Sequence, residues 1–372
     1  MTNTLGIIFS NIYDSALSDL TRVRTVASLP FAARYRQIDF ILSNMSNAGL
    51  KQIGIITKYN YRSLMDHIGS GQEWDLNLKN NNLVILPPFA TGHSGIYRGK
   101  LEALYNSLDF LKSSDAEYVI LSDSVTLCAI DLAHVLDEHI ASGCDLTAVV
   151  TPYQDYEEKR FQIVVQLDES GKVRDMAADV STSDDLAGMG IYIVNRKLLI
   201  SAVQRCVSRG RYHLERDFLL RDFNKDRLSI HGYVFRGTVL FNFTSYDYYR
   251  NSMALLDPEI FHGIFGQRGL TIYTKVRDAV PTYYGEKSRV DDCLVADGCR
   301  LKGTAEHSIL FRNVTIAESA IVRDCILMQG CVVSQGAVLE GMVLDKNVTV
   351  RPHTVLKGTR EHPLIIEKGA TV

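Results

Sequence analysis

Few side chains in the sequence fall at spacings typical of a catalytic or metal site. The ten histidines form no HExxH motif and no ligand cluster with the seven dispersed cysteines, so a structural zinc is not expected and the thiols are expected to be reduced. His307 and His353 lie in a repetitive C-terminal region, where a histidine between two coils could serve acyl transfer. The alternative is that both are solvated, as most lone histidines in turns are.

The overall charge argues against two classes of partner. With 40 Lys and Arg against 43 Asp and Glu, bulk electrostatics favour neither nucleic acid nor an anionic membrane. No apolar run approaches the ~18 residues needed to span a bilayer. The first fifteen residues lack a basic start and a long apolar run, which indicates a strand rather than a signal peptide. We therefore expect a cytoplasmic protein.

The elements that must position any site include a repeat near the C-terminus. Blocks starting at Ser308, Cys325 and Met342 align without gaps at an offset of 17 residues, and a fainter copy from Cys293 aligns at an offset of 15. Apolar residues recur in columns, which are Ile309/Ile326/Val343, Val314/Cys331/Val348, Ile316/Val333/Val350 and Ala320/Ala337/Thr354. This spacing predicts a left-handed parallel β-helix whose stacked coils bury the columns as a continuous interior. An ordinary antiparallel sheet is the alternative, but it would not need a fixed register.

The chain before the repeat alternates apolar strands with amphipathic helices. Strands are predicted at 5–9, 52–57, 117–122 and 145–150, and helices at 38–48, 61–68 and 101–111. The alternation predicts a Rossmann-like α/β domain with a mostly parallel sheet over residues 1–245, whose ligands lie beyond the carboxyl ends of the strands. A helical connector and linker are expected over 246–285, and the β-helix over 286–372.

Several motifs occur in the order of a known family. They are F-x-x-x-Y-R-x-I-D-F-x-L-S-N from Phe31, IYRG (Ile96–Gly99), GMGIYIV (Gly188–Val194), RDFLL (Arg216–Leu220) and SYDYYRNSMALL (Ser245–Leu256). With the coil, they resemble the ADP-glucose pyrophosphorylases over almost the full length of the chain. That family has a nucleotidyltransferase domain of GT-A-like fold and joins glucose 1-phosphate to ATP with release of pyrophosphate. Its reaction needs a phosphate cradle, carboxylates that hold magnesium and a sugar-phosphate pocket.

The resemblance implies that the phosphate cradle is lost. The family's cradle is a glycine-rich loop with an arginine, followed by L-x-x-L-T. Here the L-x-x-L-T tail remains at residues 17–21, but Ala16 stands at the arginine and no glycine occurs between residues 6 and 49. Asp14 and Asp19 place negative charge in the loop, which would repel a triphosphate.

The resemblance also implies a degenerate metal site and an eroded sugar pocket. The two magnesium carboxylates align with Ser124 and Asn242, and a shift of one residue would leave Asp123 as a ligand. In the sugar-phosphate pocket, Asp179 stands at the family's binding lysine. The family positions that persist, as a vestigial substrate site, are Tyr97, Arg98, Gly99, Gly188 and Gly190.

A retained scaffold with altered chemistry predicts a regulatory subunit that is non-catalytic or weakly catalytic. The family includes a divergent second subunit that associates with the catalytic one, which implies activation of a catalytic paralogue in a heterotetramer. A homo-oligomer is the alternative assembly. No cofactor is expected, with magnesium only if residual activity exists. Two other functions stay open: an active sugar-1-phosphate nucleotidyltransferase with a rearranged metal site at Asp123 and Asp217, and an acyltransferase working on the coil.

Four arginines, at positions 22, 24, 34 and 36, cluster beside the family's region for anionic effectors. Arg34 and Arg36 are therefore candidate ligands of a sugar-phosphate or nucleotide effector. A solvated basic face is the alternative.

Overall fold

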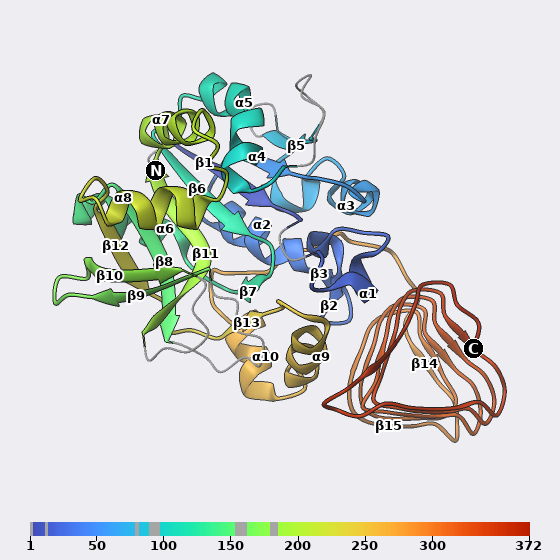
Figure 1. The fold of residues 1–372 in the computed structure, drawn as a ribbon. Helices are drawn as coiled ribbons and strands as arrows, with labels where there is room; N and C mark the ends of the chain where they lie inside the picture. The colour runs from blue at the N-terminus through green and yellow to red at the C-terminus, as the bar shows by residue number, and fades with distance from the viewer. Residues whose placement is uncertain (1–2, 12–13, 79–81, 89–96, 153–161, 179–184) are drawn as a thin grey trace.

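The structure, a computed structural model, describes residues 3–11, 14–78, 82–88, 97–152, 162–178 and 185–372 (Figure 1). A nine-stranded mixed sheet forms the centre of the N-terminal part. Its parallel half consists, in order, of β5 (Asn82–Leu86), β4 (Gln52–Ile56), β1 (Thr4–Phe9) and β6 (Tyr118–Asp123). In the other half, β11 (Leu186–Asn195) is antiparallel to β6. Strand β11 also pairs in antiparallel fashion with β8 (Leu146–Pro152) and β9 (Ile163–Leu167). At the edges, β10 (Val173–Ala178) lies beside β9 and β12 (Ile230–Val234) lies beside β8.

Helices cover both faces of this sheet because its strands are apolar on both sides. In β1, Ile8 belongs to one apolar core and Ile7 to another, so the strand separates the two cores. The first core receives side chains from α2 (Gln37–Asn47) and α6 (Leu132–Ser142). The second receives side chains from α4 (Lys100–Asn106), α5 (Leu108–Ser113) and α7 (Arg196–Val207).

The helix predicted over residues 101–111 is two helices, α4 and α5. The hydroxyl of Ser107 donates a 3.0 Å hydrogen bond to the carbonyl of Ala103 at the break. A serine that bonds back to a carbonyl four residues earlier tends to bend a helix, which accounts for the interruption. The break leaves Lys100 in the first turn of the shorter helix α4.

Shorter elements complete the N-terminal part. They are α1 (Ser18–Thr21), η1 (Val26–Ser28), β2 (Pro30–Phe31), β3 (Tyr35–Arg36), α3 (Arg62–Ile68), η2 (Gln72–Trp74), β7 (Thr126–Cys128), the π-helix η3 (Glu215–Leu220), α8 (Arg221–Phe223) and β13 (Val239–Phe241). Two helices, α9 (Ser245–Ala254) and α10 (Pro258–Phe265), then lead through an extended segment into the coil. Within the described ranges, no helix is both long and apolar enough to cross a membrane.

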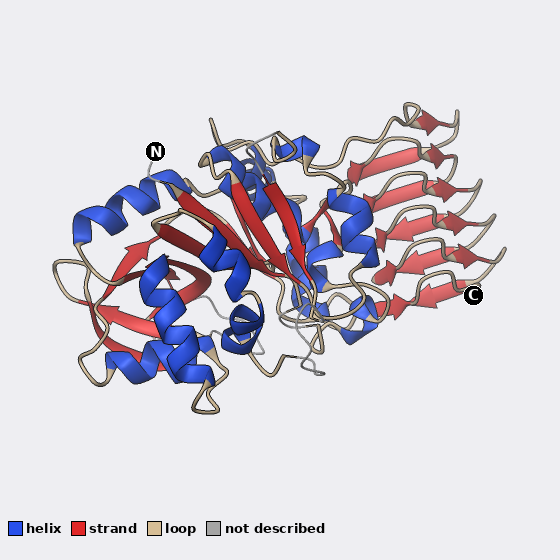
Figure 2. Cartoon of the chain, turned by 90° about the horizontal axis from the view of Figure 1, so that it is seen from above, coloured by secondary structure: helices blue, strands red, loops and turns tan. Residues whose placement is uncertain are grey.

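The C-terminal part is a three-sided parallel β-helix. Figure 1 looks almost along its axis, so the coils superpose as a triangle, and Figure 2 shows them stacked. One side consists of β14 (Tyr283–Tyr284), β16 (Arg300–Leu301), β18 (Thr315–Ile316), β21 (Val332–Val333) and β24 (Thr349–Val350). The other two consist of β15 (Arg289–Val295), β17 (Thr304–Leu310), β19 (Ile321–Arg323), β20 (Ile326–Leu327), β22 (Val338–Glu340), β23 (Met342–Leu344), β25 (Val355–Lys357) and β26 (Leu364–Ile366).

The strand register matches the repeat offsets. Ile309 pairs with Ile326, which pairs with Val343, at 17 residues each time. Cys293 pairs with Ser308, at 15. The predicted fold class, a nucleotidyltransferase-like α/β domain followed by a parallel β-helix, is confirmed.

One predicted column of the β-helix points outward. Leu327 lies in the coil interior, but its neighbour Ile326 belongs to the first core of the N-terminal part, and both are fully buried. Because successive strand residues face opposite sides, the whole Ile309/Ile326/Val343 column packs against the N-terminal part rather than inside the coil. One continuous core therefore joins the two parts of the molecule.

Candidate functional site

The carboxyl end of β6 holds a buried cluster of charges. Lys100, in the first turn of α4, places its ammonium 2.9 and 3.0 Å from the two carboxylate oxygens of Asp123. It also lies 2.6 Å from Glu215 at the start of η3 and 2.7 Å from the side-chain oxygen of Gln162. The side chains of Lys100 and Asp123 are only 4% and 3% exposed. This end of the sheet, where a ligand is expected, is occupied by the chain itself.

The cluster holds two carboxylates and one ammonium, and this composition sets its protonation. Burial disfavours the Lys100 ammonium, but Asp123 and Glu215 outweigh burial and hold its pKa above the ordinary value. Burial raises the pKa of Asp123 to about 6 and Glu215 adds to the rise, although Lys100 opposes it. The two acids thus keep the buried lysine in its charged form.

Glycine is required beside Asp123. Gly190 in β11 has φ +69°, and a Cβ there would lie 2.7 Å from a carboxylate oxygen of Asp123. The other persisting glycine of this strand, Gly188, packs directly against Ile163. A Cβ added to Gly188 would lie 2.4 Å from Cγ1 of Ile163. Ser124 points elsewhere, since its hydroxyl donates to the carbonyl of Phe9 at 3.3 Å.

The persisting positions before α4 are engaged within the chain. Arg98 contacts Glu102 at 2.6 Å, and its guanidinium lies 3.6 Å from the ring centroid of Tyr212. A Cβ on Gly99 would lie 2.2 Å from the carbonyl oxygen of Tyr212, so glycine is needed for close backbone packing. Tyr97 is buried, and burial raises its pKa to about 12. Asp179 lies outside the described residues.

The loop after β1 is closed by its own carboxylate. Asp14 accepts a 2.8 Å hydrogen bond from the backbone N–H of Val26 and contacts the amide of Asn11. Burial raises the pKa of Asp14 to about 6, against the lowering effect of Asn11 and Val26. Ala16 is half-buried and Asp19 is exposed. A carboxylate of the loop thus occupies one of the loop's own backbone N–H donors.

Asp217 does not join Asp123. Its carboxylate accepts hydrogen bonds from the backbone N–H groups of Tyr212 and His213, both at 2.9 Å, and pairs with Arg216 at 3.0 Å. The acid that contacts Lys100 together with Asp123 is Glu215, which precedes Asp217 by two residues. The rearranged metal site suggested by the sequence is therefore not assembled from these two aspartates.

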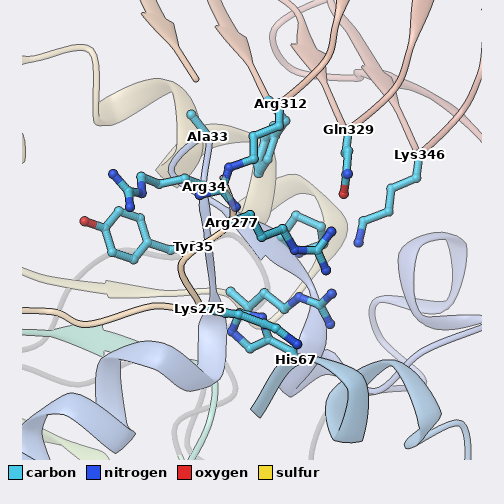
Figure 3. Close-up of a pocket in the computed structure, with 12 residues that line it drawn as sticks. Ala33, Arg34, Tyr35, His67, Lys275, Arg277, Arg312, Gln329 and Lys346 are labelled. Atoms are coloured by element: carbon cyan, nitrogen blue, oxygen red, sulfur yellow. The ribbon is translucent and has the colours of Figure 1, made fainter. Parts of the chain in front are cut away.

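A second pocket, which we call the basic pocket, lies between the N-terminal part and the β-helix. In Figure 3, Arg312, Gln329 and Lys346 extend from the coils towards residues of the N-terminal part and of the extended segment. No acidic residue is among its described lining. The lining residues are Pro30, Ala33, Arg34, Tyr35, Arg36, His67, Lys275, Arg277, Phe311, Arg312, Gln329 and Lys346.

The four clustered arginines have different environments. Arg34 is exposed over the ring of Tyr35, whereas Arg36 is buried and donates to the carbonyl of Ser63 at 2.6 Å. Burial lowers the pKa of Arg36 to about 10, mainly against the influence of Asp39. Both line the basic pocket. Arg24 instead makes a buried bidentate pair with Asp345, at 2.7 Å for each oxygen, and Arg22 forms an exposed pair with Glu367.

Comparison with known proteins identifies the family. Residues 6–237 match the family model described as nucleotidyl transferase, and residues 279–362 match one described as GlmU-like, C-terminal hexapeptide. The chain belongs to the nucleotidyl transferase family.

Several named proteins align with nearly the whole length of this chain. Glycogen biosynthesis protein GlgD of Bacillus subtilis (strain 168) is 35% identical, over 98% of this chain and 96% of that protein. Glycogen biosynthesis protein GlgD of Geobacillus stearothermophilus is 36% identical over the same shares. Glucose-1-phosphate adenylyltransferase of Bacillus mycoides (strain KBAB4) is 30% identical, over 92% of each chain. The resemblance inferred from the motifs is confirmed.

Magnesium, which the nucleotidyl transferase reaction implies, does not fit this chain. Asn242, the second expected metal position, is fully buried and accepts a 2.9 Å hydrogen bond from Asn251 of α9. Its neighbours Phe241 and Phe243 line the cavity beside Asp123 and stack on each other with centroids 5.3 Å apart. Among the described residues, no group of three His, Cys, Asp or Glu side chains could hold a metal ion.

The two candidate histidines of the β-helix lie in different environments. His307 pairs through Nδ1 with Asp324 at 2.6 Å, and that carboxylate also pairs with Arg360 at 2.8 Å. His353 is exposed. No contact joins the two histidines, which sit on different coils.

Residue patterns missed the partners of both sites. Lys100 and Glu215 are 115 residues apart, and nothing in their spacing pairs them. The basic pocket did leave a signal: Arg312, Gln329 and Lys346 are successive members of one 17-residue column. Comparing polar as well as apolar columns would have shown that this face of the coils presents cationic and amide groups.

Proposed function

We propose that this chain is a regulatory subunit of ADP-glucose pyrophosphorylase in bacterial glycogen biosynthesis, with little or no activity alone, that activates a catalytic paralogue. The observation that supports it most directly is the buried amide of Asn242 at the second expected metal position, which is hydrogen-bonded to Asn251, while Phe241 and Phe243 line the cavity beside Asp123. An amide brings no charge to a divalent ion, and the Lys100 ammonium already contacts Asp123, which disfavours the ion that would neutralise a leaving pyrophosphate. Relatives named for glycogen biosynthesis favour the pathway, and we place the protein in the cytoplasm as part of this proposal.

The test measures ADP-glucose formation from glucose 1-phosphate and ATP. A catalytic glucose-1-phosphate adenylyltransferase is assayed alone, with this chain, and with an equal amount of albumin, and this chain is also assayed alone. We expect little turnover by this chain and a rise in rate or in effector response only when the two are mixed. An unchanged rate and response, together with no co-elution by gel filtration, would reject the proposal.

The regulatory role includes an anionic effector, and we place it in the basic pocket. Six lining residues are arginine or lysine (Arg34, Arg36, Lys275, Arg277, Arg312 and Lys346), which suits a sugar phosphate or a nucleotide that carries several negative charges. The pocket joins the coil to the N-terminal part, so a ligand there contacts both. Such a ligand can change how the two parts pack.

Variants separate this pocket from general surface charge. Arg277→Met and Lys346→Met are each expected to weaken binding of inorganic sulfate, used as a probe, at least tenfold in titration calorimetry. The matched control is Arg351→Met, which removes an exposed arginine of the same β-helix outside the pocket. Equal losses in all three variants would show that only overall charge matters.

A further inference from the structure

The environment of Lys100 is more specific than the loss of a metal site requires. A lysine ammonium has three hydrogen-bond donors, and here it meets Asp123, Glu215 and Gln162 at 2.6–3.0 Å. All its donors are therefore satisfied inside the protein. A buried charge is tolerated when it is both paired and hydrogen-bonded in this way.

The groups that meet the ammonium come from separate segments of the chain. Lys100 begins α4, Asp123 ends β6 and Glu215 begins η3. Gln162 directly precedes β9. A single positive charge thus joins four segments around the carboxyl end of the sheet, as a bound metal ion would.

Without that charge, two largely buried acidic groups would lie close together with no cation between them. Asp123 is fully inside the protein and the Glu215 side chain is only 12% exposed. Two carboxylates that both contact one ammonium group repel each other when that cation is removed. The pair therefore needs a resident cation, which the chain supplies itself.

We propose that the ammonium of Lys100 is a built-in cation that takes the place of a divalent metal ion between Asp123 and Glu215 and closes this end of the sheet to metal. The inference deepens the proposed function, since it assigns a positive stabilising role to the remnant of the active site. It does not depend on any catalytic partner. Its test therefore fails or succeeds separately from the activation assay.

The first measurement uses the unmodified protein. Manganese(II) is titrated into the full chain and into Asp123→Asn, and bound ion is followed by electron paramagnetic resonance. The two proteins are expected to bind equally little manganese. A site in the unmodified protein that disappears in Asp123→Asn would overturn the proposal, because metal would then displace the lysine.

The second measurement removes the ammonium. Lys100→Met, which keeps the length of the side chain but not its charge, is expected to lower the melting temperature by 10 °C or more and to gain one manganese site. Millimolar manganese should then restore most of the loss, while it leaves the unmodified protein unchanged. The matched control is Arg24→Met, which unpairs the single buried carboxylate of Asp345 and should gain no manganese rescue.

A triple variant covers the case in which Lys100→Met does not fold. Lys100→Met/Asp123→Asn/Glu215→Gln removes all three charges, so it should fold, melt above the single variant and show no response to manganese. If the triple variant is no more stable than Lys100→Met, or if folded Lys100→Met binds no manganese, the lysine is not acting as a replacement for a metal ion.

Discussion

At the scale of single residues, charged side chains of this protein make buried contacts after β1 and at the end of β6. The Asp14 carboxylate bonds to a backbone N–H in the loop after β1, and the Lys100 ammonium lies between two acids at the end of β6. In both places a group of the chain supplies the charge that an external ligand would bring. A charged side chain in either place opposes a ligand of the same charge. For Asp14, the titration of the carboxyl group can be measured.

Asp14 provides a test through pH. Its pKa in the folded protein is about 6 against 3.8 as the ordinary value, so between these values the folded state binds more protons than the unfolded one. Stability from this group is therefore present below pH ~4 and is lost as the pH rises through about 6. Asp14→Asn keeps an oxygen that can accept from Val26 and should stabilise the protein by about 1–3 kcal/mol at pH 8.

The measurement compares urea unfolding of both proteins at pH 4.5 and pH 8. The advantage of Asp14→Asn should shrink strongly at the lower pH, because Asp14 is then protonated in the folded state. An advantage of the same size at both values would mean that hydrogen bonding, rather than buried charge, determines the difference.

Lys346 provides a second test, in the basic pocket. Burial, with repulsion from Arg36 and Arg24, lowers its pKa to about 7, although Asp345 opposes this. A bound anion favours the charged lysine, so binding above pH 7 must take up a proton. Sulfate, which does not titrate in this range, should bind more weakly as pH rises from 6.5 to 8.5. Calorimetry in buffers of different ionisation heat measures the proton uptake, which should vanish in Lys346→Met.

At the scale of elements, a buried ion pair fixes the segment before η1 to the turn after β23. Arg24 and Asp345 are 2% and 3% exposed and lie 321 residues apart in sequence. Removing one partner of such a pair leaves a buried charge without compensation, whereas replacing both by apolar groups is often tolerated. Arg24→Met should therefore destabilise the protein by about 3–5 kcal/mol, and Arg24→Met/Asp345→Leu should recover most of that loss.

Equilibrium unfolding of both variants and of Arg22→Met checks this expectation. Arg22 forms the neighbouring exposed pair, so its loss should cost under about 1 kcal/mol. If the double variant is no better than Arg24→Met alone, the pair makes a net favourable contribution that apolar packing cannot replace.

The elements also show what a sequence can predict. The 17-residue offset determines the strand register, because each coil repeats the same three sides, and Ile309, Ile326 and Val343 align in the structure as they do in the sequence. Which side of the strand faces the coil interior could not be predicted, since both sides of this face are apolar: Ile326 packs outward and Leu327 inward. Lys100 and Glu215 escaped prediction for a different reason, because only the folded sheet brings them together.

At the scale of the whole molecule, the N-terminal part and the β-helix share one core. Ile309, Ile326 and Val343 belong to the same apolar cluster as α2 and α6. Shared burial of this kind couples the stability of the two parts. We expect a single calorimetric unfolding transition for the unmodified chain.

A charge in the shared face should uncouple the two parts. Ile326→Asp places an unpaired carboxylate between them and is expected to split the transition into two. Thr315→Asp, on a half-buried strand position of another side of the coil, is the control and should keep one transition. Two transitions in the unmodified protein would show that the shared core does not couple the parts.

The column Arg312, Gln329 and Lys346 has a consequence for how such a protein can diversify. Neighbouring strands lie about 4.8 Å apart, so a column presents one side chain to a bound ligand at each such interval along the β-helix. A single substitution in the column changes the charge at one step while the stacked interior stays intact. Related chains can therefore differ in the anionic metabolite that they bind by substitution of one residue per coil, while the fold stays the same.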